Sequence, residues 1–191
     1  MKNNLKKIST TFAFLLILFG ISQVVHAAEA ISVIKPFFGT YEGDAISSAE
    51  EADKRSLRVK VWPTGDDSFH LIWETTVHKT DGREKVTEHS VEFRVSKRDG
   101  VYGSAMRKNL FGKWEPLNPM KGDPYIWAKI KDDTFIVYAM IITEDGGYEM
   151  QQYNRRIIDD ETMELVFNRI RDGEKLRTIK GFLKRVESNY P

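Results

Sequence analysis

Asp-Gly pairs divide this chain into short runs in which polar and apolar residues alternate. Three such pairs, Asp81-Gly82, Asp99-Gly100 and Asp172-Gly173, and the related Asp145-Gly146-Gly147 lie between these runs. Asp-Gly between alternating runs is a strong hairpin signal, because glycine adopts the positive φ that a tight turn requires. The repeated signal predicts an antiparallel meander, in which each strand pairs with the next one.

Ten runs have the length and alternation of strands, whereas only residues 47–54 suggest a short helix. The expected strands are Phe38–Ile46, Ser56–Pro63, Ser68–Lys79, Lys85–Ser96, Val101–Met106, Tyr125–Lys131, Thr134–Thr143, Tyr148–Ile158, Thr162–Arg171 and Lys175–Val186. Short strands with turn signals between them and few helical patterns predict an all-β fold, an antiparallel meander barrel of roughly 8–10 strands.

The N-terminus has the layout of a secretory signal peptide. A basic start, Met1–Lys7, precedes the apolar stretch Ile8–Val25, and Val25-His26-Ala27 places small residues at the first and third positions of a cleavage site. This pattern predicts a signal peptide at residues 1–27 and one domain at residues 28–191. An uncleaved membrane anchor is the alternative, because the apolar stretch approaches spanning length.

Charge and cysteine content narrow the function classes. Removing Lys2, Lys6 and Lys7 from the 29 basic residues leaves 26 against 28 acidic ones, so the predicted mature chain has a formal charge of −2. A nearly neutral domain gives no electrostatic case for binding nucleic acid. The chain has no cysteine, which excludes thiol catalysis and thiolate metal sites. We expect a periplasmic or secreted bacterial protein with no membrane span in its mature part.

Matching apolar faces sets the expected register of two hairpins, since a slip of one residue reverses the faces of a strand. In the first hairpin, a three-residue loop at residues 81–83 pairs Phe69 with Val95, Leu71 with Phe93, Trp73 with Val91 and Thr75 with His89. In the last hairpin, the same test pairs Met163 with Leu183, Phe167 with Ile179 and Arg169 with Arg177.

The first expected strand carries a family resemblance. Its sequence, Phe37-Phe38-Gly39-Thr40-Tyr41-Glu42-Gly43, resembles the opening strand of the lipocalin-like barrels, or calycins, whose signature is Gly-x-Trp. Tyr41 replaces the tryptophan. The resemblance implies a meander barrel around an internal apolar cavity, and it implies that Arg185, near the last strand, packs over Tyr41. The chain also resembles uncharacterised secreted bacterial proteins with this strand order.

No arrangement of residues in the sequence predicts catalysis or metal binding. His70 and His78 lie eight residues apart on one strand, roughly 26 Å, which is too far to share a metal ion. Ser104 lacks the Gly-x-Ser-x-Gly elbow of a hydrolase nucleophile. We therefore predict no metal, no cofactor and no enzymatic activity.

The strand Tyr148–Ile158 is the best candidate for the wall of a ligand site. Its inward residues are expected to be Glu149, Gln151, Tyr153, Arg155 and Ile157, with Met150, Gln152 and Arg156 facing outward. The predicted ligand contacts are Trp73, Tyr138, Gln151, Tyr153, Arg155, Arg169, Arg177, Phe111 and Trp114. An amphipathic ligand would place its tail against Trp73, Phe93 and Phe167 and its anionic head near the arginines. The alternative partner for those arginines is Glu149, since buried charges pair within proteins.

A connection of unusual length joins two of the strands. Residues 107–124 have no clear regular pattern yet include Leu110, Phe111, Trp114, Leu117 and Met120. Long connections in compact domains are usually functional or disordered. This one is expected to be either a lid, with Phe111 and Trp114 touching ligand, or a plug that closes one end of the barrel.

Two functions therefore fit the sequence. The first is an exported lipocalin-like protein that binds a small apolar or amphipathic ligand inside the barrel. The second is a non-enzymatic envelope protein-interaction or inhibitor module, whose barrel core is filled by its own side chains. The volume of the interior distinguishes them, because a filled interior leaves no room for a ligand.

Overall fold

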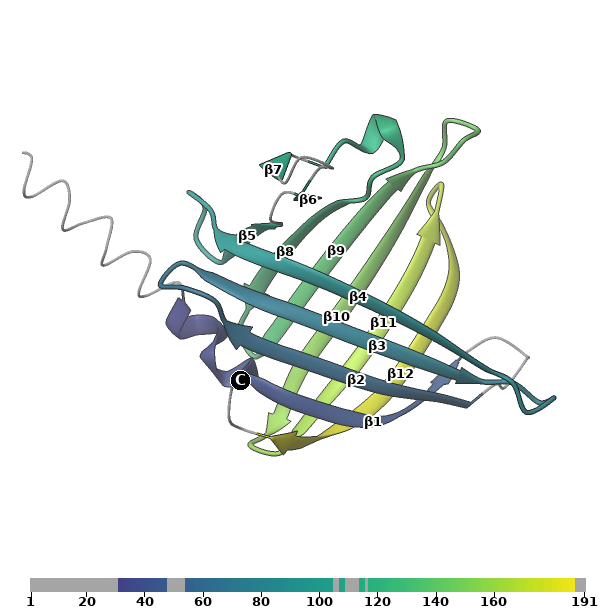
Figure 1. The fold of residues 1–191 in the computed structure, drawn as a ribbon, viewed down its shortest axis with the longest axis horizontal. Coiled ribbons are helices and arrows are strands. Elements are labelled where there is room, and N and C mark those ends of the chain that lie inside the picture. Colours follow the sequence, from purple (N-terminus) through teal and green to yellow (C-terminus); the bar gives the residue numbers. More distant parts are fainter. Residues whose placement is uncertain (1–30, 48–53, 105–106, 109–113, 116, 188–191) are drawn as a thin grey trace, which may run out of the picture.

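The chain forms a closed antiparallel β-barrel in a computed structural model. The structure describes residues 31–47, 54–104, 107–108, 114–115 and 117–187. Ten strands close the barrel in the order β1-β12-β11-β10-β9-β8-β5-β4-β3-β2. In Figure 1, β1 to β4 cross in front of β8 to β12. The predicted all-β meander barrel is confirmed.

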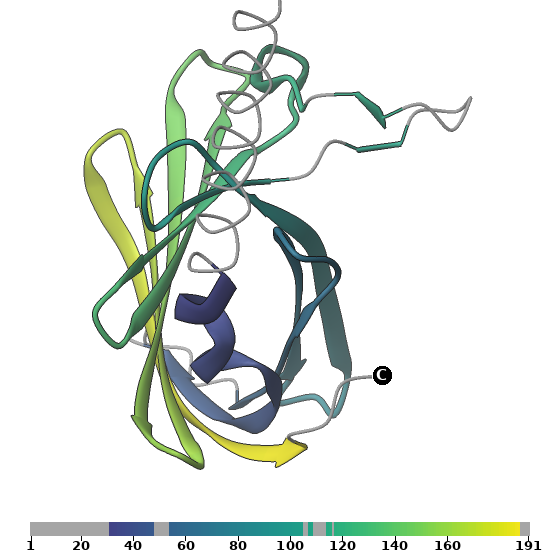
Figure 2. The same ribbon diagram turned by 90° about the vertical axis from the view of Figure 1, so that its left-hand side faces the viewer.

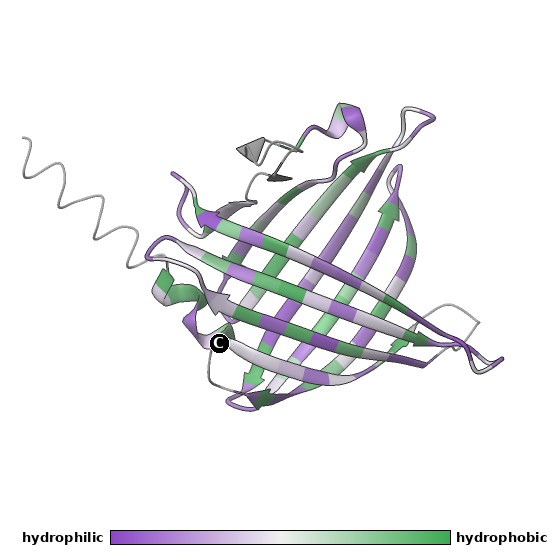
Figure 3. Cartoon of the chain, viewed as in Figure 1, coloured by the Kyte–Doolittle hydropathy of each residue, from purple (hydrophilic) through white to green (hydrophobic). Residues whose placement is uncertain are grey.

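The strand bounds are close to those expected from the sequence. The barrel strands are β1 (Gly39–Ser47), β2 (Lys54–Pro63), β3 (Ser68–His78), β4 (Glu84–Val95), β5 (Val101–Ser104), β8 (Tyr125–Lys131), β9 (Thr134–Ile142), β10 (Tyr148–Asp159), β11 (Thr162–Arg171) and β12 (Glu174–Glu187). Two short strands, β6 (Arg107–Lys108) and β7 (Trp114–Glu115), and two 3₁₀ turns, η1 (Lys35–Phe37) and η2 (Pro119–Lys121), complete the described elements. Figure 3 shows hydrophobic and hydrophilic residues alternating along the barrel strands.

The residues before β1 close one end of the barrel. A helical turn at residues 31–34 runs into η1, and Ile34 and Phe37 are almost completely buried. In Figure 2 this segment lies across the end of the barrel. Because its side chains pack against the aromatic core, the described residues fill that end of the barrel.

Tyr41 and Arg185 fasten this closed end. The Arg185 guanidinium lies 4.7 Å from the centroid of the Tyr41 ring, as the resemblance to lipocalin-like barrels implies. It also donates hydrogen bonds to the carbonyl oxygens of Phe38 and, at 3.0 Å, Pro36. One side chain from the last strand therefore holds the ring and the backbone of the entering segment together.

The seam between β1 and β12 depends on a close approach of two backbones. A Cβ atom added at Gly43 would lie 2.1 Å from the carbonyl oxygen of Phe182. No other residue fits there without a shift of one strand, because real contacts are never that short. Glycine in the opening strand thus serves the closure of the barrel.

The last hairpin, β11–β12, has the predicted register. Met163 pairs with Leu183, Phe167 with Ile179 and Arg169 with Arg177, and on the other side of β11, Tyr153 pairs with Phe167. Glu149, Tyr153 and Arg155 of β10 are buried, whereas Arg156 is exposed. The predicted division of β10 into inward and outward residues is confirmed.

The predicted register of the β3–β4 hairpin is wrong, because the observed pairing is shifted by two residues along β4. Trp73 lies opposite His89 rather than Val91, and Phe69 lies opposite Phe93. The loop is Thr80-Asp81-Gly82, closed by hydrogen bonds from Lys79 to Arg83 and from Gly82 to Lys79. Gly82 has φ of 82°, and a three-residue loop places its left-handed residue last, so the glycine must end the loop.

The long connection between β5 and β8 contains more structure than expected. β6 and β7 pair with each other, Lys108 opposite Trp114, and Figure 2 shows them extending away from the barrel. η2 contacts β9, and Met120 in η2 is 80% exposed. Whether the connection is a lid or a plug stays a prediction, because Phe111 and the Trp114 side chain, on which it rests, lie outside the described residues.

Candidate functional site

The two halves of the barrel interior differ in packing. The half next to η1 contains an aromatic cluster in which Phe69, Phe93, Tyr102 and Phe135 are each at most 1% exposed. The other half contains a cavity of about 410 Å³. Its lining consists of Leu57, Val59, Trp73, Glu74, Thr75, Lys85, Thr87, His89, Glu149, Gln151, Tyr153, Leu165, Phe167, Arg169, Arg177 and Ile179.

The cavity is apolar at its floor and polar at its mouth. Trp73 and Tyr153 are at most 9% exposed and have ring centroids 5.2 Å apart, and Phe167 lies 4.7 Å from Tyr153. Toward the mouth, the inward positions are charged or polar, as at Lys85, Thr87 and Arg177. This gradient is the one expected from the inward residues of β10.

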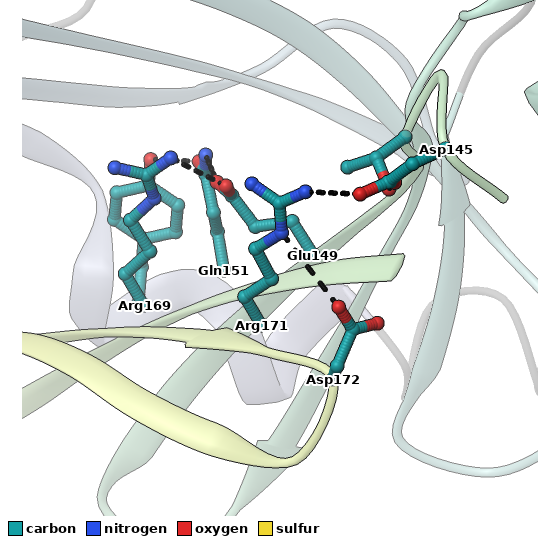
Figure 4. A network of polar contacts seen from close by, with 8 residues as sticks. Asp145, Glu149, Gln151, Arg169, Arg171 and Asp172 are labelled. Atoms are coloured by element: carbon teal, nitrogen blue, oxygen red, sulfur yellow. Dashed lines mark hydrogen bonds and ion pairs between the residues drawn. The ribbon is translucent and has the colours of Figure 1, made fainter. Parts of the chain in front are cut away.

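A chain of hydrogen bonds follows the inner face of β10 toward the mouth, part of it drawn in Figure 4. The Tyr153 hydroxyl donates to Gln151 over 2.9 Å, and the Gln151 amide donates to Glu149 over 2.7 Å. Arg169 donates to the other Glu149 carboxylate oxygen over 2.6 Å. Glu149 is therefore the internal partner of Arg169, which is one of the two alternatives that the sequence leaves open.

The ion pair with Arg169 lowers the pKa of Glu149. The hydrogen bond from Arg169 is the main cause, and burial of the carboxylate opposes it. A carboxylate whose pKa is lowered by folding stabilises the folded state above its ordinary pKa of 4.5 and loses that contribution as the pH falls through the lowered value.

We expect the free energy of unfolding of Glu149→Gln to fall less steeply than that of wild type as the pH is lowered into the acid range. Between the ordinary pKa of a glutamate and the lowered one, wild type loses stability on acidification, and the variant lacks this contribution. At neutral pH, the substitution is expected to cost about 1 kcal/mol, because Arg169 is partly exposed and the pair is screened. Urea unfolding at a series of pH values measures both effects, and an unchanged fall in the acid range would contradict the assignment.

Two cations at the mouth have no such partner. Arg177 lies directly opposite Arg169 on the neighbouring strand, and Lys85 lies on β4. Neither forms an ion pair within the part of the chain that the structure describes. Like charges directly opposite one another across two strands are destabilising. The mouth therefore carries an excess of positive charge suited to an anion.

His89 adds a stacked ring to this wall. Its imidazole lies 4.8 Å from the Trp73 ring at an interplanar angle of 25°. Burial lowers the pKa of His89, so the ring is neutral at neutral pH. It extends the aromatic surface of Trp73 toward the mouth.

Arg155 lies beneath the floor of the cavity. Its side chain is 0% exposed, and its Nε and both Nη atoms have no hydrogen-bond partner within the described chain. Three rings surround it, with centroids 5.4 Å away for Tyr153, 5.5 Å for Trp73 and 5.7 Å for Phe135. Burial lowers the pKa of Arg155 to about 10, so it is charged at neutral pH. Ring contacts contribute about 2 kcal/mol, whereas an unpaired buried charge costs several.

Five of the predicted ligand contacts line the cavity: Trp73, Gln151, Tyr153, Arg169 and Arg177. Arg155 faces inward as predicted but lies below the cavity. The prediction that Tyr138 faces the interior is wrong, because it lies on the outer face and stacks on Trp127 at 4.9 Å. Phe111 and the side chain of Trp114 lie outside the described residues.

Two further predictions about the ligand site need correction. Phe93 belongs to the filled half, where it stacks on Phe69 at 5.4 Å, and it is not a tail contact. Lys85 and His89 were missed as site residues. Their place at the mouth becomes visible once the β3–β4 hairpin has its correct register.

The described part of the chain shows neither a metal-binding cluster nor a membrane helix. In the described ranges, no three His, Asp or Glu side chains are grouped so that they could hold a metal ion. Those ranges likewise contain no helix with the length and hydrophobicity needed to cross a bilayer. The predicted signal peptide at residues 1–27 lies outside them.

Fold and cavity together define a closed antiparallel meander β-barrel with one open half. No family model and no curated protein matches the sequence. The S-type phycobiliprotein lyase CPES from Guillardia theta superposes with a TM-score of 0.50 and 10% identity, over 83% of this chain and 93% of the lyase. Rv2717c from M. tuberculosis gives a TM-score of 0.50 and 13% identity, over 82% and 96% of the two chains.

These likenesses show the fold, and they correct one prediction. The sequence led us to predict that the protein is not an enzyme. A solved structure with this fold is a lyase, so the barrel is compatible with enzymatic activity and that prediction is withdrawn.

Proposed function

We propose that the protein binds a small amphipathic molecule with an acidic group in the open half of the barrel. The observation that carries the proposal is the cavity of about 410 Å³, which is apolar at its floor. Two cations at its mouth, Lys85 and Arg177, form no ion pair among the described residues. Ligand pockets of drug-sized molecules have volumes of this order, from about 300 Å³ upward.

The division of the lining orients the ligand. The apolar part packs against Trp73, Leu165 and Phe167, which removes apolar surface from water on both sides. The acidic group lies near Arg177 and Lys85, beside the Arg169–Glu149 pair. Charge-assisted hydrogen bonds to such a group are about twice as strong as neutral ones.

A barrel filled throughout by its own side chains, the basis of the interaction or inhibitor alternative, is not supported. Only the half next to η1 is filled. The hollow half is lined by residues from β2, β3, β4, β10, β11 and β12, so filling it would require most of the barrel wall to move inward.

Export to the periplasm or the outside of a bacterial cell is part of the proposal. It rests on the basic start, the apolar stretch and the small residues at Val25 and Ala27. Cleavage after Ala27 leaves the closing segment intact, because residues 31–37 lie on the C-terminal side of that site. Mass spectrometry of the exported chain tests this, and a mass that includes residues 1–27 would contradict it.

We expect laurate to quench the fluorescence of Trp73 on binding, because that indole forms part of the apolar wall. The uncharged analogue dodecanol is expected to bind about tenfold more weakly, since it lacks the charge that Arg177 and Lys85 attract. Combining Lys85→Met with Arg177→Met should abolish the preference for laurate. The matched control is Lys180→Met, which removes an exposed cation on the outer face of β12.

The result that contradicts the proposal is also defined. If laurate and dodecanol bind wild type equally, or if neither changes the fluorescence, the mouth cations do not select an anion. A Trp73→Phe variant identifies the reporting indole among the four tryptophans of the chain.

A further inference from the structure

Arg155 is a cation without an anion in the part of the barrel nearest the cavity floor. None of its three guanidinium nitrogens has a hydrogen-bond partner in the described part of the chain, and the side chain is completely buried. Glu149 is paired with Arg169 instead. Such a residue weakens the fold, and departures of this kind from good packing are typical of functional sites.

Two rings of the cavity floor contact Arg155 from the side of the cavity. Trp73 and Tyr153 both line the cavity and both contact the guanidinium. A change in the rotamer of either ring would therefore join the space around Arg155 to the cavity. The other ring on Arg155, Phe135, belongs to the filled half.

The distance between the two cationic regions follows from the strand. Arg155 lies four residues along β10 from Gln151, whose neighbour across β11 is Arg169, opposite Arg177. Four residues of a strand span roughly 13 Å. An extended molecule along the barrel axis could thus reach the mouth cations with one end and Arg155 with the other.

We propose that Arg155 is a second, deep anion subsite, and that the ligand is an elongated molecule with an acidic group at each end and an apolar middle. This inference rests on the proposed function. The inner acid displaces the ring of Trp73 or Tyr153 and accepts two parallel hydrogen bonds from the Arg155 guanidinium, whose planar fork matches a carboxylate. The outer acid lies at the mouth, near Arg177 and Lys85.

Dodecanedioate and its monomethyl ester test the subsite in the wild-type protein. With the subsite, the diacid is expected to bind about tenfold more tightly than the ester, because both of its acids are paired. Without the subsite, the order reverses, since the second carboxylate would enter the barrel unpaired. This comparison needs no variant, so it does not depend on whether a substitution folds.

Substitution of Arg155 gives the second arm of the test. Arg155→Met is expected to lose the preference for the diacid while keeping laurate binding, and to raise Tm by about 3 °C or more, because an unpaired buried charge is removed. Arg156→Met, the next residue on the outer face, is the matched control and should keep the preference. An Arg155→Met protein that still prefers the diacid would overturn the proposal, as would one that binds laurate weakly.

Failure of the subsite and failure of the proposed function give different results. If wild type binds neither laurate nor dodecanedioate, the proposed function itself fails. If wild type binds laurate but binds the diacid no more tightly than its ester, only the deep subsite is wrong, and Arg155 is a structural residue of the floor.

Discussion

Phe135→Ala is expected to lower the free energy of unfolding by about 4 kcal/mol, because it leaves a cavity in the filled half of the barrel. The Phe135 ring is 0% exposed and packs against Phe37, Phe69 and Phe93 at centroid distances of 5.6, 5.7 and 6.4 Å. These rings come from opposite walls and from the closing segment, so they cannot move together to fill the space. Urea unfolding followed by circular dichroism measures the loss.

Phe167→Ala is the matched control in the hollow half. The Phe167 ring already borders the cavity, so its removal creates little new empty space and is expected to cost about 2 kcal/mol. It should also weaken laurate binding, whereas Phe135→Ala in its folded state should not. Equal costs for the two substitutions would contradict the division of the barrel into a filled half and a hollow half.

Arg185→Ala is expected to lower the free energy of unfolding by about 3 kcal/mol. The substitution removes the cation over the Tyr41 ring and the hydrogen bonds that Arg185 donates to the carbonyl oxygens of Pro36 and Phe38. Hydrogen exchange is expected to increase first at the start of β1, because Arg185 joins that segment to β12.

The control for this prediction is a surface arginine. Arg156 pairs with Glu164 on the outer face, and its side chain is 48% exposed, so Arg156→Ala should cost no more than about 1 kcal/mol. If Arg185→Ala were equally mild, the contact over Tyr41 would be a surface contact and not a fastening of the closed end.

The strands could be predicted because their signals are local. Alternation selects a face, and the Asp-Gly turns end the runs, so the β11–β12 hairpin and its Arg169–Arg177 pair follow from the sequence alone. The β3–β4 register failed because residues 80–82 and 81–83 both give three-residue loops with apolar pairs. Only the position of glycine in the loop distinguishes them, and Gly82 must come last.

The candidate site was only partly predictable, for reasons that are also physical. Tyr138 lies within β9, and both faces of this strand carry large apolar residues, so the sequence alone does not fix its side. Whether Arg155 borders the cavity or lies beneath it depends on how the rings of Trp73 and Tyr153 pack. That packing joins β3 to β10, and no local pattern describes it.

The division of charges is likewise a property of the assembled barrel. The sequence shows that Glu149, Arg169 and Arg177 share one end of the interior, but one carboxylate can satisfy either arginine. Glu149 pairs with Arg169, and Arg177 forms no ion pair with any residue that the structure describes. This pairing makes Arg177 the cation that can bind an anion at the mouth.

Solution NMR of the protein with laurate tests the central claim most directly, because it locates the ligand. We expect intermolecular NOEs from the laurate chain to the rings of Trp73 and Phe167, and none to Phe93 in the filled half. Amide shifts should change around Lys85 and Arg177 at the mouth. NOEs confined to outer residues such as Trp127 and Tyr138, or no NOEs at saturating laurate, would contradict binding inside the open half of the barrel.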